Sequence, residues 1–598
     1  MNQTSIPRPE YPRPDFARQS FQNLNGQWDF AFDDDDRGIE EQWYRRADFP
    51  RKITVPYVYQ CALSGIHEKT PHPIVWYRKT LRICPEGEGK RVLLHFGAVD
   101  YMATVWVNGQ MVGSHTGGST PFEFDITPQV RMGEENTIAV RVFDDPCDME
   151  APRGKQYWKQ ESEGIFYTAS TGIWQTVWLE QVNPDRLSRI WVTPDVDRKC
   201  IGIRMELEGK SEKQVRVTVK FRGYTYADDL VRVANNRCQR EFWLDQRISL
   251  DWNHQESMVW SPENPVLFDL HFEVLVSGAA TDVVDSYTAL RKVSVVDGKF
   301  MLNNRPYYQK MLLDQGYWPT GLITAPSDED YIRDIQACKD MGFNGVRKHQ
   351  KVEDPRYLYH ADRMGLLVWG ECPAAYIYSR KAAMELTQSW METIRRDYNH
   401  PCILCWVPLN ESWGVDGIMH NPEEQAFSQS AYYLTKALDQ TRLVISNDGW
   451  NHTVSDLLTI HDYAGEYREL KERYDGELEG ILSSTPGHRT LYAQGSHYGG
   501  QPIIVSEFGG IGYRKDAQQG WGYTAAVSGE DFAERYRAVV RAVMESRHVQ
   551  GYVYTQICDV EQEINGLMTY DRKYKIDPKI IREINQSLHH EEQGGKCT

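Results

Sequence analysis

Two glutamates each follow an apolar stretch in the second half of the chain. Glu411 comes after residues 404–409 and Asn410, and Glu507 comes after residues 503–506. Each stretch predicts a buried strand that ends at a carboxylate, and a charge beside an apolar core requires a reason. Hydrolysis of a glycosidic bond supplies one, because it needs one carboxylic acid and one carboxylate. The structural alternative is a pair of glutamates in salt bridges to Arg347 or Lys348.

The separation of the two carboxyl groups would decide the stereochemistry. A retaining mechanism needs carboxyl groups about 5–5.5 Å apart, one as acid/base and one as nucleophile. An inverting mechanism needs about 6.5–9.5 Å, which leaves room for a water molecule. Glu411 and Glu507 alone leave both mechanisms open.

From about residue 293, predicted strands alternate with helices. Helices are expected over 328–341 and 529–548, where apolar residues recur at helical spacing. The eight predicted strands are 307–314, 345–349, 366–371, 403–411, 443–450, 457–463, 503–509 and 551–559. This order predicts a (β/α)₈ barrel, whose active site lies at the C-terminal ends of its strands.

Polar and aromatic residues close these strands, which makes them candidates for binding a sugar. Asn410 could reach the sugar 2-hydroxyl if the strand end twists, because neighbouring strand residues otherwise point apart. Two histidines and a tyrosine could hold hydroxyls or orient the nucleophile, and two tryptophans could form sugar platforms; core and rim packing are the alternatives. The predicted substrate-binding residues are Asp314, His349, Asn410, Trp413, Trp450, His461, Tyr463, Tyr554 and Gln556.

The first half of the chain predicts two all-β regions, residues 1–185 and 186–292. In the first, the alternating stretch 105–112 is interrupted by Asn108-Gly109, which indicates a hairpin. In the second, short strands over about 100 residues suit an immunoglobulin-like sandwich.

Composition excludes several classes of function. The net charge of -17 and the lack of a basic stripe argue against nucleic acid as a partner. No apolar run is long enough for a membrane span, and the N-terminus shows no signal peptide. The 11 cysteines are scattered, and Cys402 and Cys405, close together on one predicted strand, are expected to be small core residues, so neither zinc nor disulfides are indicated. We expect a cytoplasmic protein without metal or cofactor. The sequence does not decide whether it forms a homo-oligomer.

At this point the chain resembles glycoside hydrolase family 2, the β-galactosidase, β-glucuronidase and β-mannosidase family. Asn410-Glu411-Ser412 matches the acid/base motif and Ser506-Glu507-Phe508-Gly509 the nucleophile motif, and the N-terminal half matches at residues 23–30, 96–100, 107–109, 117–122 and 171–180. The resemblance implies a jelly-roll-type, sugar-binding-type β-sandwich (1–185), an immunoglobulin-like β-sandwich (186–292) and a catalytic TIM barrel (293–598). It also implies retaining exo-hydrolysis, with Glu411 as acid/base and Glu507 as nucleophile.

The substrate pocket departs from the standard members. β-Glucuronidases carry an Asn-x-Lys motif that grips the sugar carboxylate. Near the matching place this chain has Glu563-Ile564-Asn565-Gly566-Leu567, without that lysine, and Arg572 and Lys573 follow and could partly substitute for it. The first barrel strand lacks the Arg-His-Glu of well-studied β-galactosidases. We expect an oligosaccharide or glycoside substrate, a β-galactoside first. The alternatives are a β-glucuronidase, a β-galactofuranosidase or arabinofuranosidase, and a carbohydrate-binding protein that is no enzyme.

Overall fold

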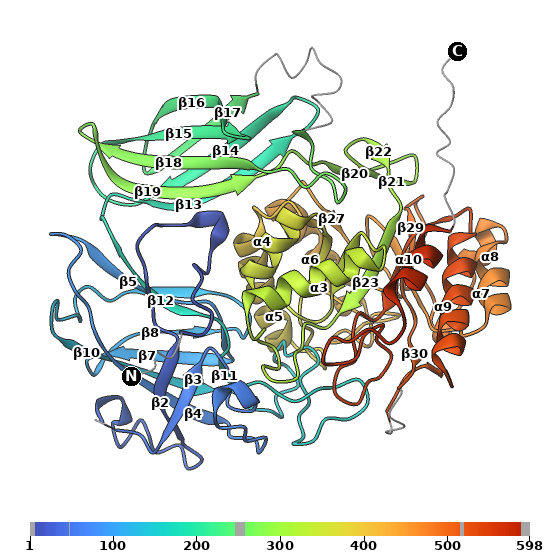
Figure 1. Cartoon of the computed structure of the whole chain (residues 1–598), viewed down its shortest axis with the longest axis horizontal. Coiled ribbons are helices and arrows are strands. Elements are labelled where there is room, and N and C mark those ends of the chain that lie inside the picture. The colour runs from blue at the N-terminus through green and yellow to red at the C-terminus, as the bar shows by residue number, and fades with distance from the viewer. Residues whose placement is uncertain (1–5, 47, 245–257, 515–519, 588–598) are drawn as a thin grey trace.

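The computed structural model describes residues 6–46, 48–244, 258–514 and 520–587. The chain forms an N-terminal β-sandwich, a second β-sandwich and a barrel of strands and helices (Figure 1). In Figure 1 the barrel forms the right side of the molecule, and the two sandwiches form the left side.

The N-terminal sandwich encloses one apolar core between two sheets. At the predicted hairpin, Asn108 and Gly109 have φ of 51° and 76°, the left-handed values that a tight two-residue turn requires. One sheet has the order β3 (Arg51–Val55), β2 (Gly26–Phe32), β4 (Ile74–Arg82), β10 (Glu135–Phe143), β7 (Met102–Val107), β8 (Gln110–Thr116). The other has the order β1 (Gln22–Asn23), β12 (Val177–Val182), β5 (Arg91–Phe96), β9 (Phe122–Asp125).

The second sandwich is also antiparallel, and its strands alternate buried and exposed residues because only one face of each sheet meets the core. One sheet consists of β13 (Leu187–Asp195), β14 (Cys200–Leu207) and β17 (Arg237–Trp243). The other has the order β16 (Tyr224–Arg232), β15 (Lys213–Phe221), β18 (Phe268–Val276), β19 (Ala279–Thr288).

A small sheet leads into the barrel, whose eight strands are all parallel. The small sheet is β20 (Val293–Val296), β21 (Lys299–Leu302) and β22 (Arg305–Pro306). The barrel order is β27 (Leu443–Val444), β26 (Ile403–Val407), β25 (Leu367–Glu371), β24 (Gly345–Lys348), β23 (Gln309–Asp314), β32 (Val549–Thr555), β29 (Ile503–Gly509), β28 (Leu458–Asp462). Seven of the eight predicted stretches contain one of these strands and the stretch 551–559 overlaps β32, so the predicted fold class is confirmed.

Helices surround the barrel sheet, and most begin at a side-chain cap. Asp354, Ser379, Asn421, Ser528 and Asp577 each accept a hydrogen bond from a backbone N–H of the first turn. The helices are α3 (Asp328–Asp340), α4 (Pro355–Met364), α5 (Arg380–Asp397), α6 (Pro422–Leu438), α7 (Tyr467–Tyr474), α8 (Leu478–Leu482), α9 (Gly529–Met544) and α10 (Pro578–Gln586). In the part of the chain that the structure describes, no helix is long and apolar enough to cross a membrane.

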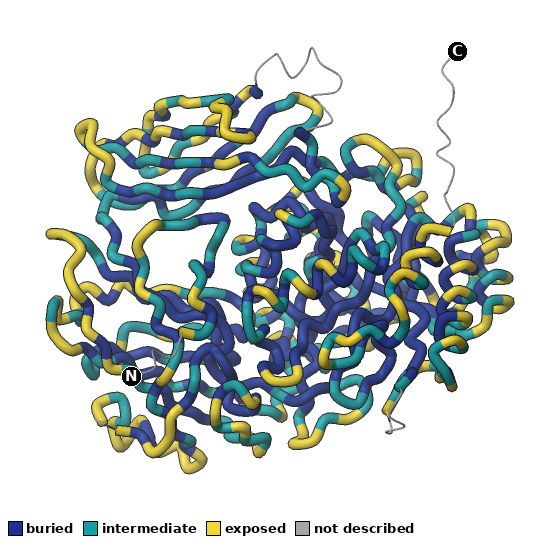
Figure 2. The backbone as a smooth tube through the Cα atoms, viewed as in Figure 1, coloured by how far each residue is buried: buried dark blue, intermediate teal, exposed yellow. Residues whose placement is uncertain are grey.

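The barrel strands are buried on both faces, as Figure 2 shows by their dark blue colour. A rigid scaffold of this kind fixes the side chains at the strand ends. One connection of the N-terminal sandwich, residues 144–171 between β10 and β11 (Gly172–Ile173), runs against the barrel and is called the sandwich arm below.

Candidate active site

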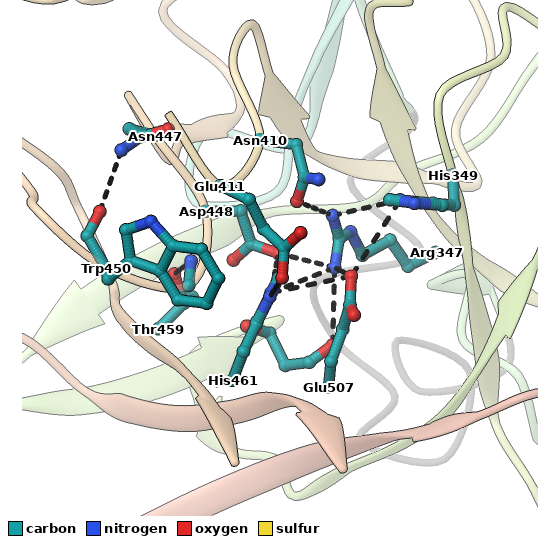
Figure 3. Close-up of polar contacts among 12 residues, drawn as sticks. Arg347, His349, Asn410, Glu411, Asn447, Asp448, Trp450, Thr459, His461 and Glu507 are labelled. Atoms are coloured by element: carbon teal, nitrogen blue, oxygen red, sulfur yellow. Dashed lines mark hydrogen bonds and ion pairs between the residues drawn. The ribbon is translucent and has the colours of Figure 1, made fainter. Parts of the chain in front are cut away.

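The backbone turns sharply where β26 ends. Glu411 and Ser412 have φ of 52° and 60°, in the left-handed region, so the strand alternation does not continue through them. Asn447 holds this turn, because its Oδ1 accepts from the Ser412 N–H at 2.9 Å and its Nδ2 donates to Ser412 Oγ at 3.1 Å. Asn410 and Glu411 therefore both point toward the same group of side chains (Figure 3).

Glu507 lies inside β29, with a side chain only 5% exposed. Its Oε1 lies 2.8 Å from Arg347 Nη1, and the Tyr463 hydroxyl donates a hydrogen bond to its Oε2. Both carboxylate oxygens of Glu507 are therefore fixed in position by a donor.

Arg347 is fully buried and joins four of the strand ends (Figure 3). Besides Glu507, its Nε contacts Glu371 Oε2 at 2.7 Å and its Nη1 contacts Asp448 Oδ2 at 2.6 Å. Its Nη2 donates to Asn410 Oδ1 at 2.6 Å, which leaves the Asn410 amide nitrogen buried without a partner. The salt-bridge alternative thus holds for Glu507, and Arg347 orients Asn410 as well.

His461 lies between three carboxylates. Its Nδ1 is 2.7 Å from Glu411 Oε1, and its Nε2 is 3.0 Å from Asp448 Oδ2 and 3.6 Å from Glu507 Oε1. Burial alone would lower its pKa, but Glu507, Asp448 and Glu411 raise the pKa of His461 to about 10. Burial raises the pKa of Glu411, yet His461 outweighs burial and leaves that pKa below its usual value.

The second histidine of the site is uncharged. His349 Nδ1 lies 3.0 Å from Glu371 Oε1 and 3.2 Å from Arg347 Nη2. Burial, followed by the charge of Lys155, holds the pKa of His349 well below its ordinary value. The two histidines therefore carry different charges at neutral pH.

The two glutamates are close together. One oxygen of Glu411, one of Glu507 and a nitrogen of His461 all lie within 4.8 Å of one another. Among the described residues these three form the one group with the spacing of a metal site. Both nitrogens of His461 already have carboxylate partners, so hydrogen bonding accounts for the cluster without an ion.

Two tryptophans flank the cluster. Trp413 packs against Phe166 of the sandwich arm and Tyr376, at ring distances of 5.5 and 5.6 Å. Trp450 meets His461 edge-on at 5.5 Å, and its indole nitrogen is buried without a partner among the described residues (Figure 3). Both positions suit rings beside a bound sugar.

Two of the substrate-binding residues predicted from the sequence, Asp314 and Gln556, have structural partners. Asp314 is buried, accepting from Lys348 Nζ at 2.6 Å and from the Gly316 N–H at 2.8 Å. Gln556 donates to Asn565 at 2.8 Å. These contacts argue for structural roles.

Tyr554 packs against Tyr536 of α9 and Phe508, away from the cluster, because it lies on the outer face of β32. Its neighbour Thr555 lies on the inner face, with Oγ1 3.2 Å from the Tyr463 hydroxyl. The prediction for Tyr554 thus chose the wrong face of this strand.

The suggested substitutes for the missing lysine are engaged elsewhere. Arg572 pairs with buried Asp334 at 3.2 Å and donates to the Tyr317 carbonyl at 2.7 Å. Lys573 is 79% exposed and pairs with Asp571. These partners do not favour a role for either residue in place of the lysine.

No sequence pattern marks two further residues near the cluster. Lys155 comes from the sandwich arm and places its ammonium 5.1 Å over the Trp413 ring. Tyr523 stacks on Tyr463 at 3.3 Å. Both sit in loops, where no strand pattern marks them.

Models of one family cover nearly the whole chain. Residues 21–177 match the sugar binding domain of glycosyl hydrolases family 2, residues 186–291 match a further model of this family, and residues 293–590 match its TIM barrel domain. The chain belongs to glycosyl hydrolase family 2, as its motifs predicted.

Curated relatives fall into two activities. A β-galactosidase of Thermoanaerobacter pseudethanolicus is 28% identical over 405 residues, 65% of this chain but only 50% of that enzyme. The β-glucuronidase of Rattus norvegicus is 25% identical over 545 residues, 81% of this chain and 77% of that enzyme. Among solved structures, a β-glucuronidase from Ruminococcus gnavus in complex with D-glucuronic acid aligns with a TM-score of 0.77 at 19% identity, covering 97% of this chain and 100% of that one.

Proposed function

We propose that this chain is a retaining exo-β-glycosidase that releases a terminal sugar by double displacement, with a β-galactoside as the leading substrate. The observation that carries this proposal is the pair of carboxyl oxygens of Glu411 and Glu507 within 4.8 Å of each other. This closeness favours the retaining separation of about 5–5.5 Å over the inverting one.

The surroundings of the two glutamates support different roles for them. Glu507 is held by Arg347 and Tyr463, so its carboxylate is oriented as a nucleophile must be. Glu411 is more exposed, at 17%, and among the described residues its carboxylate pairs only with His461, so it can face the leaving group and later a water molecule. Glu507 attacks the anomeric carbon while Glu411 protonates the departing oxygen; Glu411 then deprotonates the water that releases the sugar.

Asn410 fits a role in transition-state binding. Its Oδ1 is fixed by Arg347 while its amide nitrogen is buried and unpartnered, aimed at the group that contains both glutamates. A hydrogen bond from this amide to the sugar 2-hydroxyl would strengthen as the oxocarbenium-like transition state forms.

A β-glucuronidase is the second candidate, because several similar proteins carry that activity. The stretch 563–567, near the place where β-glucuronidases carry their carboxylate-binding motif, contains no lysine, and this favours a neutral sugar. A furanoside also stays open, since the catalytic pair does not fix ring size.

A panel of 4-nitrophenyl β-glycosides tests the proposal: galactopyranoside, glucuronide, galactofuranoside and arabinofuranoside. We expect turnover of the galactopyranoside, with NMR showing the β-anomer as first product. Binding of these glycosides without release of nitrophenol would favour a carbohydrate-binding protein instead. A cytoplasmic location is part of the proposal, supported by ten described cysteines that are all free.

A further inference from the structure

The sandwich arm is fixed against the barrel from two sides. Tyr376, beyond β25, donates its hydroxyl to the carbonyls of Gly154 at 2.8 Å and Gln156 at 2.7 Å. Gln562, beyond β32, donates to the carbonyls of Gly164 and Phe166, both at 2.8 Å. The arm is therefore held in place above the strand ends of the barrel.

Gly154 allows the arm to come this close. Its φ is +60°, and a Cβ at this position would lie 2.4 Å from the Gln350 carbonyl oxygen. Only glycine fits such an approach without displacing the backbone. The next residue, Lys155, is thus delivered to the active site at a set position.

The Lys155 side chain is buried but lacks a counter-ion. The residue is 7% exposed, and its ammonium lies over the Trp413 ring, two residues beyond Glu411. No carboxylate of the described residues lies within 4.0 Å of it, and it makes no hydrogen bond to them. A cation–π contact contributes only about 0.5–2 kcal/mol, so an ammonium on a largely buried lysine, with no hydrogen-bond acceptor among the described residues, suits a ligand site.

Glu563 approaches the same space from beyond β32. It is 3% exposed, and its carboxylate accepts hydrogen bonds from the Tyr167 hydroxyl of the arm at 2.5 Å and from Asn565 Nδ2 at 2.9 Å. Burial raises its pKa, the charge of Lys155 opposes this shift, and Glu507 adds to it. The backbone N–H of the same Tyr167 donates to the Lys155 carbonyl at 2.9 Å, so one arm residue links Lys155 to Glu563.

We propose that Lys155 and Glu563 together bind hydroxyl groups of a neutral terminal sugar, and that this pair sets specificity against uronic acids. The inference rests on the proposed glycosidase function. An ammonium only donates hydrogen bonds and a carboxylate accepts them, so a sugar hydroxyl between the two satisfies both. A uronate would add a carboxylate to a space already lined by Glu411, Glu507 and Glu563, with one free ammonium to balance it.

The test combines enzyme variants with substrates that lack single hydroxyls. Lys155→Met is assayed on 4-nitrophenyl β-D-galactopyranoside, on its 3-, 4- and 6-deoxy analogues and on the glucuronide. We expect kcat/KM on the parent sugar to fall about 10- to 100-fold, as for a lost charged hydrogen bond. On the analogue lacking the contacted hydroxyl, the wild type is already slow and the substitution changes little. This interdependence would not arise from a general structural defect.

Lys159→Met is the matched control. Lys159 belongs to the same arm, but it is 60% exposed and 3.9 Å from Glu163, so its loss should leave every kcat/KM unchanged. If Lys155→Met does not fold, Glu563→Gln is assayed on the same substrates, because an amide retains the shape of the carboxylate.

The outcomes separate the two proposals. A wild-type enzyme that hydrolyses no glycoside refutes the proposed function itself. An active wild type whose Lys155→Met variant loses the same factor on every analogue refutes the hydroxyl contact. A wild type that prefers the glucuronide, with that preference abolished by Lys155→Met, would assign Lys155 to a sugar carboxylate and overturn the neutral-sugar inference.

Discussion

His461 and Glu411 form a hydrogen bond of 2.7 Å between Nδ1 and Oε1. Because neighbouring carboxylates raise the pKa of His461 to about 10, this partner is an imidazolium at neutral pH. A cation beside a general acid promotes loss of its proton. The contact therefore limits the pH range over which Glu411 can protonate a leaving group.

Replacing His461 should move the alkaline side of the pH profile. In His461→Asn the cation that lowers the pKa of Glu411 is gone while burial, which raises it, remains. Glu411 then keeps its proton to higher pH, and the alkaline limb of kcat/KM shifts upward. The maximum should fall about 10- to 100-fold because Glu411 loses its orienting partner.

His349→Asn is the control for charge. His349 is neutral because burial lowers its pKa, and it contacts Arg347 and Glu371 but not Glu411. In His349→Asn, the alkaline limb of the kcat/KM profile should lie at the same pH as in the wild type. If chemistry is rate-limiting and the alkaline limb of kcat/KM does not shift in His461→Asn, the assignment of Glu411 as the acid is contradicted.

The two glutamates should respond differently to removal. Glu507→Ala should lose nearly all turnover, since nothing replaces a nucleophile. Glu411→Ala should retain more activity on nitrophenyl glycosides, whose leaving groups need little protonation, after a loss of about 10²–10⁴ in turnover. Azide should partly restore Glu411→Ala and give a β-glycosyl azide, which NMR identifies. Equal losses in both variants without rescue would refute the division of roles.

Asp314 should matter for stability and not for sugar binding. Its carboxylate is buried and paired with Lys348, which also pairs with Glu353 at 2.8 Å. Asp314→Asn weakens this network and should cost roughly 1–3 kcal/mol of unfolding free energy. Thermal denaturation should show a lower midpoint, while KM stays within about twofold. A large rise in KM with an unchanged midpoint of thermal denaturation would instead support the prediction that Asp314 binds substrate.

The closeness of Glu411 and Glu507 could be predicted from the sequence for a physical reason. Barrel strands are buried on both faces, so β26 and β29 read as uninterrupted apolar runs, and any carboxylate that closes such a run stands out. The rule that the carboxyl ends of barrel strands form one face then brings Glu411 and Glu507 together. The side-chain direction of Asn410 could only be left conditional, because it depends on the left-handed turn at Glu411.

Other parts of the site lie beyond such reasoning. The pairing of β29 with β32 shifts register twice, so alternation along the sequence did not reveal that Thr555, and not Tyr554, faces inward. Lys155 reaches Trp413 through a contact between two domains, across a loop with no periodic pattern. Long-range loop contacts of this kind depend on how whole domains pack.

The hydroxyl of Tyr463 gives a last prediction, since it donates to Glu507 Oε2. Tyr463→Phe keeps the ring that stacks on Tyr523 at 3.3 Å and removes only this donor. Glu507 keeps its contact with Arg347, but its other oxygen is no longer oriented. Formation of the glycosyl–enzyme intermediate should slow about 10- to 100-fold, with little change in substrate binding.

Trapping with a 2-deoxy-2-fluoro glycosyl fluoride measures this step directly. The rate of inactivation should fall in Tyr463→Phe, while mass spectrometry still finds the label on Glu507. Tyr523→Phe, which removes a hydroxyl from the stacked partner ring and no hydrogen bond to Glu507, should react at close to the wild-type rate. If Tyr463→Phe is labelled as fast as the wild type, Tyr463 does not orient the nucleophile. A label on a residue other than Glu507 would remove the proposed mechanism.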